Sequence, residues 1–382
     1  MDWIVPLSDI AFGSEEIKAV ENVLTSGWLT MGEVTQKFEK EFAEYAGVKH
    51  ALAVANATAA LHMACQALGL VSGDEVIVPS LTFVATANAV RYTGATPVFA
   101  DIVGEDDLTI SPEAVEKAIT PRTKAIMVMH YGGYACDMPS IMSLAKQYDL
   151  AVIEDAAHAA GSRLDGKMLG TWGAAGCYSF FSNKNMTTGE GGMLVTNDDE
   201  LAEKFHLLRS HGMTAMTWDR HQGHAWSYDV VALGYNYRID EMRSALGRVQ
   251  LGKLEKFNAR RKELTTLYRN LLAELTPSMS VPFESHAGES ACHLLAVVLP
   301  RGVERICFME QMKTRGIQTS VHYPPVHRFS AFAKELKSTG WLHVTEEMGD
   351  REVTLPLFPS LSDDQVFLVV QAVRDSLREI PG

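Results

Sequence analysis

From about residue 50 onward, short apolar runs rich in β-branched residues alternate with longer stretches of helical periodicity. The apolar runs predict strands over residues 75–79, 96–101, 124–131, 151–155, 176–180 and 192–197. Helical patterns lie between several of them, at 58–70, 111–119 and 139–148. This alternation predicts an α/β fold, in which a largely parallel, twisted sheet is covered by helices on both faces. Because such sheets bind ligands at the carboxyl ends of their strands, residues at those ends are the first candidates for a site.

The segments outside this alternation predict further helices. Residues 14–24 have a helical pattern and lead into the glycine-flanked loop 25–32, which is either a lid or an ordinary helix-ending turn. Residues 238–275 are strongly helical and predict one or two long helices. Beyond them, strand-like runs at 293–299 and 317–323 precede a helical pattern at 363–378.

The length of the chain favours two domains. Its 382 residues are too many for one ordinary hydrophobic core. We predict a large domain over residues 1–250 and a smaller C-terminal α+β domain over residues 251–382, with the boundary inside the long helical region.

Composition excludes several classes of protein. The chain has 34 basic and 47 acidic side chains, a net charge of -13, whereas a surface that binds nucleic acid would be basic. No apolar run reaches the roughly 20 residues that a membrane helix needs, and the first residues lack the pattern of a secretion signal. The five cysteines are scattered, without a C-x-x-C pair, which is typical of reduced thiols and predicts a cytoplasmic protein.

Neither a metal site nor a nucleotide-binding glycine loop is predicted. The neighbouring histidines His221 and His224, and likewise His322 and His327, have no cysteine or carboxylate partners at ligand spacing. The G-x-G-x-x-G and G-x-x-x-x-G-K-[ST] motifs are also absent from the sequence. We therefore expect no metal ion and look for another kind of cofactor.

Lys184 and Asp155 predict pyridoxal phosphate. Asp155 ends an apolar run, and Lys184 lies in a loop rich in serine and glycine. The aldehyde of this cofactor condenses with a lysine amine, and an ionised aspartate keeps its ring nitrogen protonated. Taken alone, Lys184 would be a surface charge and Asp155 a helix N-cap, but together they favour the cofactor site. A buried lysine could also move the proton during the reaction, because desolvation makes its neutral form available.

Residues around this pair predict the rest of a cofactor site. The helix that begins near Ala57 and Thr58 offers free N–H groups to a phosphate, and Ser179 is a second candidate ligand. Phe83 follows a strand end and could stack on the cofactor ring, although a core phenylalanine is equally compatible. His158 could orient Asp155 or contact the cofactor, or it could be a structural histidine.

Jointly, these segments resemble the sugar aminotransferases of the DegT/DnrJ/EryC1/StrS family. The resemblance covers nearly the whole chain and depends on the segments SGWLT (26–30), NATAAL (56–61), GDEVI (73–77), EDAAH (154–158), SFFSNKN (179–185), GEGG (189–192), GYNYR (234–238), HYPPVH (322–327) and LPLFP (355–359). It implies the aspartate-aminotransferase fold (fold type I) and a homodimer with shared active sites. It further implies pyridoxal 5′-phosphate, glutamate as amino donor and a keto group on a nucleotide-linked sugar as acceptor, with a 4-keto-6-deoxy hexose as the favoured sugar.

The resemblance also implies roles for individual residues. Lys184 would bind the cofactor covalently, Asp155 would face the ring nitrogen, and His158 would be a neighbour of the cofactor. Phe83 would stack on the ring. The phosphate ligands would be Ala57, Thr58, Ser179 and, from the other subunit, Asn236. The sugar-nucleotide pocket would include Thr30, Arg238 and Tyr323.

Two departures from the family pattern and two rival functions stay open. Ala57 stands where many members have glycine, which matters only if the backbone needs a positive φ there. Cys292 stands where a tryptophan is common. One branch of the family consists of dehydrases with histidine in the lysine position, and the presence of Lys184 argues against that reaction. A regulator that binds the cofactor or the sugar without catalysis would not need Lys184 and Asp155.

Overall fold

A seven-stranded sheet forms the centre of the protein. The computed structural model describes residues 3–215, 218, 221, 223, 226–333 and 342–380. The sheet has the order β1 (His50–Val54), β9 (Gly192–Thr196), β8 (Ala175–Ser179), β5 (Ala151–Asp155), β4 (Thr123–Met129), β2 (Glu75–Pro79) and β3 (Thr96–Ala100). The strands from β8 to β3 are parallel, and β9 runs antiparallel between β8 and β1. The predicted α/β fold with a mostly parallel sheet is confirmed.

Helices cover both faces of the sheet, because side chains along a strand alternate between the faces. In β2, Val76 and Val78 pack on one side and Ile77 on the other. The side of Val76 is covered by α3 (Ala57–Ala67), α4 (Val84–Tyr92) and α7 (Asp199–Arg209). The opposite side is covered by α2 (Glu33–Ala46), α5 (Pro112–Ala118) and α6 (Met138–Tyr148).

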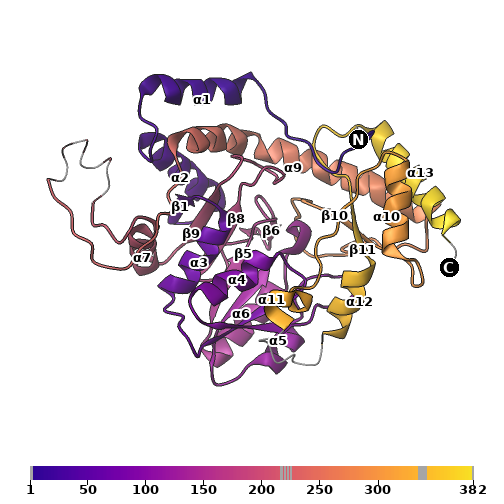
Figure 1. Cartoon of the computed structure of the whole chain (residues 1–382), viewed down its shortest axis with the longest axis horizontal. Helices are drawn as coiled ribbons and strands as arrows, with labels where there is room; N and C mark the ends of the chain where they lie inside the picture. The colour runs from indigo at the N-terminus through magenta and orange to yellow at the C-terminus, as the bar shows by residue number, and fades with distance from the viewer. Residues whose placement is uncertain are drawn as a thin grey trace.

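One long helix joins the sheet to the C-terminal elements. The helical region after residue 238 forms the single helix α9 (Glu241–Leu275), whose first turn is capped by the side chain of Asp240. Helix α1 (Ser14–Ser26) lies along its first half (Figure 1). Leu254 of α9 packs in the core beside the sheet, whereas Leu264 packs in a separate C-terminal core. Residue 250 falls inside this helix, and a domain division there stays a prediction.

The C-terminal core surrounds a two-stranded antiparallel sheet. It consists of β10 (Leu295–Val298), β11 (Glu352–Leu355), α10 (Arg305–Thr314) and α13 (Asp363–Glu379). Helix α12 (His343–Arg351) precedes β11, and its Met348 packs in a neighbouring cluster with Tyr131. Val5, from the N-terminal arm, is buried in the same core. The strand predicted over 317–323 is wrong, because only isolated bridges form there, from Ile317 to Val5 and from Ser320 to Thr354.

Short elements complete the described part of the chain. They are η1 (Tyr131–Gly133), β6 (Arg163–Leu164), β7 (Lys167–Met168), η2 (Val326–Arg328) and α11 (Ser330–Ala333). No helix in this part is both long and apolar enough to cross a membrane. His224, one of the histidines weighed as a metal ligand, lies outside the described residues.

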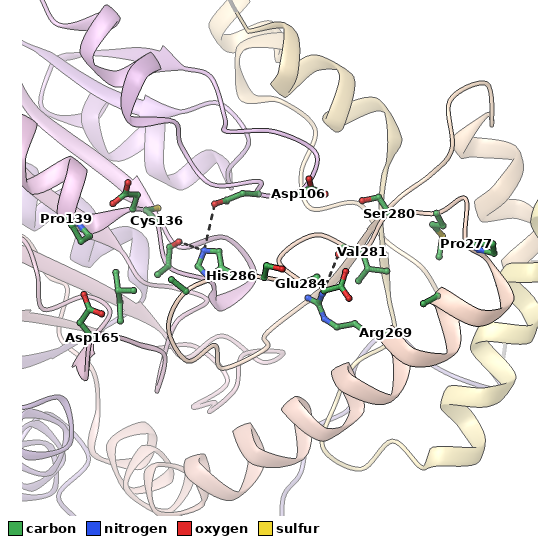
Figure 2. A pocket seen from close by; sticks show the side chains of 18 residues that line it. Asp106, Cys136, Pro139, Asp165, Arg269, Pro277, Ser280, Val281, Glu284 and His286 are labelled. Carbon is green, nitrogen blue, oxygen red and sulfur yellow. Dashed lines mark hydrogen bonds and ion pairs between the residues drawn. The ribbon is translucent and has the colours of Figure 1, made fainter.

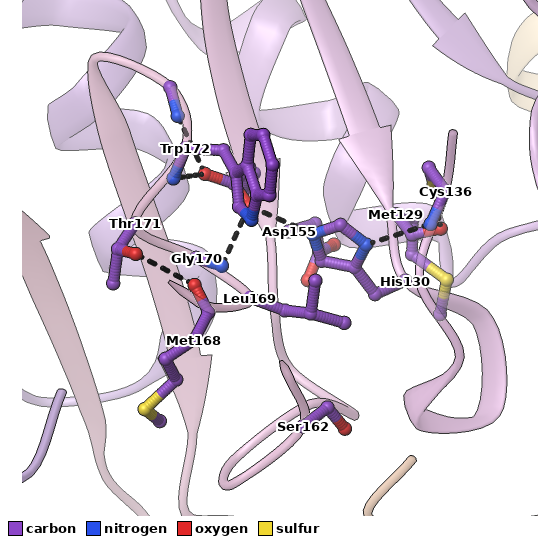
Figure 3. Close-up of polar contacts among 12 residues, drawn as sticks. Met129, His130, Cys136, Asp155, Ser162, Met168, Leu169, Gly170, Thr171 and Trp172 are labelled. Carbon is purple, nitrogen blue, oxygen red and sulfur yellow. Dashed lines mark hydrogen bonds and ion pairs between the residues drawn. The ribbon is translucent and has the colours of Figure 1, made fainter. Parts of the chain in front are cut away.

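A buried carboxylate fixes the loop between β7 and β8 against β5. Glu154 accepts hydrogen bonds from the backbone N–H groups of Gly170 (2.7 Å), Trp172 (2.6 Å) and Gly173 (2.7 Å). The backbone N–H of Cys136 donates to Nδ1 of His130, so Nε2 of His130 carries the proton and donates to Glu154 at 3.0 Å (Figure 3). Four donors therefore hold the residue that precedes Asp155.

We predict that Glu154→Gln lowers the free energy of unfolding by about 3 kcal/mol, because one acceptor oxygen becomes an NH₂ group that faces buried donors. Urea unfolding followed by circular dichroism measures the loss. Glu203→Gln, at an exposed position on α7, is the control and should stay within about 0.5 kcal/mol of the unsubstituted protein. Equal stability of the two variants would contradict the structural importance of Glu154.

Candidate active site

Lys184 lies in the loop that follows β8, at the carboxyl edge of the parallel strands. Its side chain is half-buried, and Nζ lies 3.4 Å from Nε2 of His293. Burial lowers the pKa of Lys184 from its ordinary value to about 8, although the charge of the Asp155 carboxylate opposes this shift. The neutral, nucleophilic form of the amine is therefore accessible at mildly alkaline pH.

Asp155 is the last residue of β5 and is buried. Its Oδ2 accepts a hydrogen bond from Oγ1 of Thr86 (2.8 Å), and its Oδ1 accepts one from the backbone N–H of Ala157 (3.1 Å). Burial raises the pKa of Asp155, while these two hydrogen bonds and the nearby Lys184 oppose the rise. Residues 156–160 form turns, so the interpretation of Asp155 as a helix N-cap is wrong. A cation placed against this carboxylate would favour its ionised form.

His158 contacts Tyr323 across the same site. The backbone N–H of Gly132 donates to Nδ1 of His158 (3.3 Å), so the imidazole proton lies on Nε2, which donates to the hydroxyl of Tyr323 (2.9 Å). Burial lowers the pKa of His158 well below its ordinary value, and the ring is neutral. The ring of Phe83 lies 5.7 Å from that of Tyr323. Three roles were considered for His158: orienting Asp155, contacting the cofactor, or a structural role. Its hydrogen-bond partners are Gly132 and Tyr323 and not Asp155, and a contact with the cofactor stays a prediction.

The sheet brings Ser179, at the end of β8, to the same edge as the start of α3, which carries Ala57 and Thr58. In the sheet register, Val54 pairs with Gly192, and Gly192 pairs with Ser179. Beyond the end of β1, Asn56 is the N-cap of α3, which begins at Ala57, and the side chain of Asn56 accepts a hydrogen bond from the N–H of Ala59 (2.9 Å). The first N–H groups of a helix have no partner within the helix, so those of Ala57 and Thr58 can bind a phosphate.

Glycine at position 192 permits this close approach of strand and helix. A Cβ atom there would lie 2.7 Å from the backbone nitrogen of Ala57, which is closer than real contacts allow. Ala57 itself is not among the residues with positive φ, so its methyl group is accommodated without strain. The hydroxyl oxygen of Ser179 accepts a hydrogen bond from the N–H of Phe181 at 3.3 Å and keeps its own proton to donate.

The predicted residues Thr30, Asn236 and Arg238 lie in different surroundings. Arg238 lies near the start of α3, whereas Thr30 and Asn236 lie on the surface. Arg238 is half-buried and bridges to Val54, at the end of β1. Burial and repulsion by the charge of Arg209 lower the pKa of Arg238, and no acidic side chain among the described residues pairs with its guanidinium. Thr30 is exposed and bridges to Asp240, and Asn236 is exposed on a segment paired with Ser210.

A cavity of about 940 Å³ lies apart from these residues (Figure 2). Its lining contains more acidic than basic groups, with Arg269 and His286 set against Asp106, Asp107, Asp137, Asp165 and Glu284. His286 donates to the carbonyl of Ala135 at 2.8 Å. Since carboxylates repel anions, this cavity does not suit a phosphate-bearing ligand.

The structure adds four residues to the site to which no role was assigned from the sequence. Thr86 donates to Asp155, and His293 contacts Lys184. Asn185 and Asn258 support His293 through hydrogen bonds. Asn185 adjoins Lys184 in the chain, but His293 is 109 residues away from it, and only the fold brings them together.

These residues fit pyridoxal phosphate. Lys184 offers an amine with a lowered pKa, and Asp155 offers a buried carboxylate on the same edge of the sheet. The start of α3 and Ser179 offer donors for the phosphate on that edge. The site thus combines a nucleophile, a counter-charge for a ring nitrogen and an anion cradle.

Comparisons with known proteins agree with this arrangement. The model of the DegT/DnrJ/EryC1/StrS aminotransferase family matches residues 11–374. The spore coat polysaccharide biosynthesis protein SpsC of Bacillus subtilis is 42% identical over 98% of this chain and 97% of its own. Among solved structures, Helicobacter pylori PseC, an aminotransferase involved in the biosynthesis of pseudoaminic acid, has a TM-score of 0.92 and 32% identity over 99% of this chain and 100% of its own.

The cofactor appears in a further solved structure. The PLP-form of the putative sugar aminotransferase Spr1654 from Streptococcus pneumoniae has a TM-score of 0.91 and 27% identity, over 99% of this chain and 100% of its own. The match of the family over almost the whole length, together with the lysine and aspartate at the strand edge, leads to one conclusion. The chain belongs to the DegT/DnrJ/EryC1/StrS aminotransferase family and is a pyridoxal-phosphate-dependent sugar aminotransferase.

Proposed function

We propose that this enzyme transfers the amino group of glutamate to a keto group on a nucleotide-linked sugar, with Lys184 and Asp155 as its catalytic residues. In the first half of the reaction glutamate leaves as 2-oxoglutarate, and in the second half the keto sugar becomes an amino sugar. The observation that carries the proposal is the half-buried amine of Lys184, with a pKa of about 8, near the buried carboxylate of Asp155.

Lys184 and Asp155 would have separate roles in the reaction. Pyridoxal phosphate supplies, when bound, an aldehyde that takes up amino groups and a cationic ring that withdraws electrons. Lys184 Nζ would bind the cofactor and then carry the proton to and from the reacting carbon, since it is tethered within reach. Asp155 would hold the ring nitrogen in its protonated form, with Oδ1 and Oδ2 fixed by Ala157 and Thr86.

The remaining residues would bind the phosphate, the ring and the substrate. Ala57, Thr58 and Ser179 would bind the cofactor phosphate at the start of α3, Phe83 would stack on its ring, and His158 would adjoin it. Arg238 would pair with the diphosphate of the nucleotide, because its half-buried guanidinium has no acidic partner among the described residues. Tyr323 and Thr30 would contact the sugar nucleotide. Among acceptors we favour a 4-keto-6-deoxy hexose, which is common among substrates of this family.

A homodimer with shared active sites is part of the proposal. Phe83 is 51% exposed and Phe181 45%, although both lie beside the site. Trp226 and Leu233, on the segment that leads to Asn236, are 97% and 83% exposed. A second copy of the chain would cover these apolar side chains and bring the partner subunit's Asn236 to the cofactor phosphate.

A cytoplasmic location also belongs to the proposal. All five cysteines are free, and four of them are buried. Free, buried thiols are typical of proteins that remain in a reducing compartment.

The first prediction from the proposed function concerns the reaction. Lys184→Ala should lower the formation of 2-oxoglutarate from glutamate and a 4-keto-6-deoxy sugar nucleotide by about 10³-fold or more, because the group that moves the proton is lost. A coupled assay for 2-oxoglutarate, with and without the keto sugar, measures it. Turnover that needs glutamate but no keto sugar, or full activity of the variant, would contradict the proposal.

The second prediction concerns the titration of Lys184. In the cofactor-free protein, the rate at which Lys184 reacts with an amine-selective reagent should rise with pH and reach half of its plateau near pH 8. The sign follows from burial, which favours the neutral amine and so lowers the pKa. Peptide mass spectrometry at a series of pH values measures it, with the exposed Lys40 as the internal control. A midpoint for Lys184 close to that of Lys40 would contradict the burial argument.

The third prediction concerns the shared site. Lys184→Ala and Asn236→Ala homodimers should both be impaired, whereas a purified mixed dimer should recover roughly half of the wild-type activity, because one of its two sites is complete. Tandem-tag purification of co-expressed variants provides the mixed dimer. If its activity equals the mean of the two homodimers, Asn236 acts within its own subunit and the shared-site proposal fails.

A further inference from the structure

We propose that His293 is a positioning residue for Lys184: a neutral imidazole, held in its Nδ1–H tautomer by Asn185, that accepts a hydrogen bond from the lysine amine. The inference deepens the proposed function, because Lys184 is the group to which that function assigns the proton transfer. It concerns the amine itself and depends on no particular sugar.

The hydrogen bonds of Asn185 fix the orientation of its side chain. Its Nδ2 group donates to the carbonyl of Ala291 (2.8 Å), which can only accept, and to Oδ1 of Asn258 (2.7 Å). Oδ1 of Asn185 therefore faces Nδ1 of His293, at 2.8 Å. Since an amide oxygen can only accept, Nδ1 of His293 carries the proton.

Lys184, His293, Asn185, Asn258 and Ala160 form a chain of hydrogen bonds in which each residue donates to the next. With its proton on Nδ1, the neutral ring of His293 has a lone pair on Nε2, and this atom lies 3.4 Å from Nζ of Lys184. At the far end, Nδ2 of Asn258 donates to the carbonyl of Ala160 (2.9 Å). Because a carbonyl oxygen can only accept, the hydrogen bonds of this chain cannot all run in the opposite direction. Lys184 is thus the donor at the head of the chain in both of its charge states.

Burial makes the support rigid. Asn185, His293 and Asn258 are all buried. The backbone of His293 is held on both sides, because its N–H donates to the carbonyl of Gly132 (2.9 Å) and its carbonyl accepts from Arg261 (3.2 Å). An imidazole fixed in this way can define one place for the lysine nitrogen.

The surroundings keep His293 neutral. Burial, and next the charge of Lys184, lower the pKa of His293 well below its ordinary value, and His158, Arg261 and His322 act in the same direction. His158 is itself neutral, with its ring 4.4 Å from that of His293. A proton that arrives at this cluster is therefore held by Lys184 and not by either imidazole.

This arrangement has a consequence for the free amine. When Lys184 is charged, Nε2 of His293 accepts from the ammonium group and stabilises it, and when Lys184 is neutral the same bond holds the nitrogen in place. Without the acceptor, burial alone would push the pKa of Lys184 further down. A histidine that merely fills the core would have no such effect on the titration of Lys184.

The test compares His293→Leu with His293→Gln in the cofactor-free protein, by the pH dependence of Lys184 labelling. His293→Leu should move the midpoint for Lys184 down by about one pH unit, the size expected for a lost hydrogen bond to a charged group. His293→Gln keeps an acceptor oxygen, so the midpoint for Lys184 in this variant should stay close to that of the wild-type protein. His343→Leu, at an exposed position, controls for removal of a histidine and should leave the midpoint unchanged.

Three results would overturn the proposal. The first is an unchanged midpoint in a folded His293→Leu protein, and the second is an equal shift in the Leu and Gln variants. The third is measured on the wild-type protein: the ¹⁵N chemical shifts of the His293 imidazole should show a proton on Nδ1 and none on Nε2, and the reverse pattern would refute the tautomer. Neither readout involves sugar or glutamate, so a failure here is distinguishable from a failure of the proposed reaction.

Discussion

The burial of one amine near one carboxylate is the constraint on which the rest of the site depends. Water would hold Lys184 as an ammonium ion, and its removal lowers the pKa to about 8 in spite of the opposing charge of Asp155. The same burial raises the pKa of Asp155. The lowered pKa makes the neutral amine available to react with a carbonyl carbon. The buried carboxylate would be stabilised by pairing with a cationic ring nitrogen.

The fold supplies this burial through the edge of the sheet. Asp155 ends β5, Ser179 ends β8, and Gly192 begins β9 in register with Val54 of β1. Parallel strands place these ends along one edge, where the start of α3 adds free N–H groups. Behind the edge, the fully bonded Glu154 holds the loop before β8, so that the neighbouring Asp155 lies on a fixed strand end.

Much of this could be predicted from local pattern, and the rest could not. The strands at 75–79 and 151–155 were predicted with the bounds that they have, because apolar β-branched runs and their boundaries are local signals. The run 317–323 was also predicted as a strand, but it forms only isolated bridges, to the distant Val5 and Thr354. Lys184 and Asp155 were recognisable from their neighbours in the chain, whereas the contact of Lys184 with His293 depends on tertiary structure alone.

The central claim is that the amine at position 184 is the one that binds the cofactor. Purified protein that has been incubated with pyridoxal phosphate, reduced with borohydride and digested should carry the phosphopyridoxyl group on the peptide that contains Lys184, at one group per chain. Modification of another lysine in preference to Lys184, or no stable modification at all, would contradict the account.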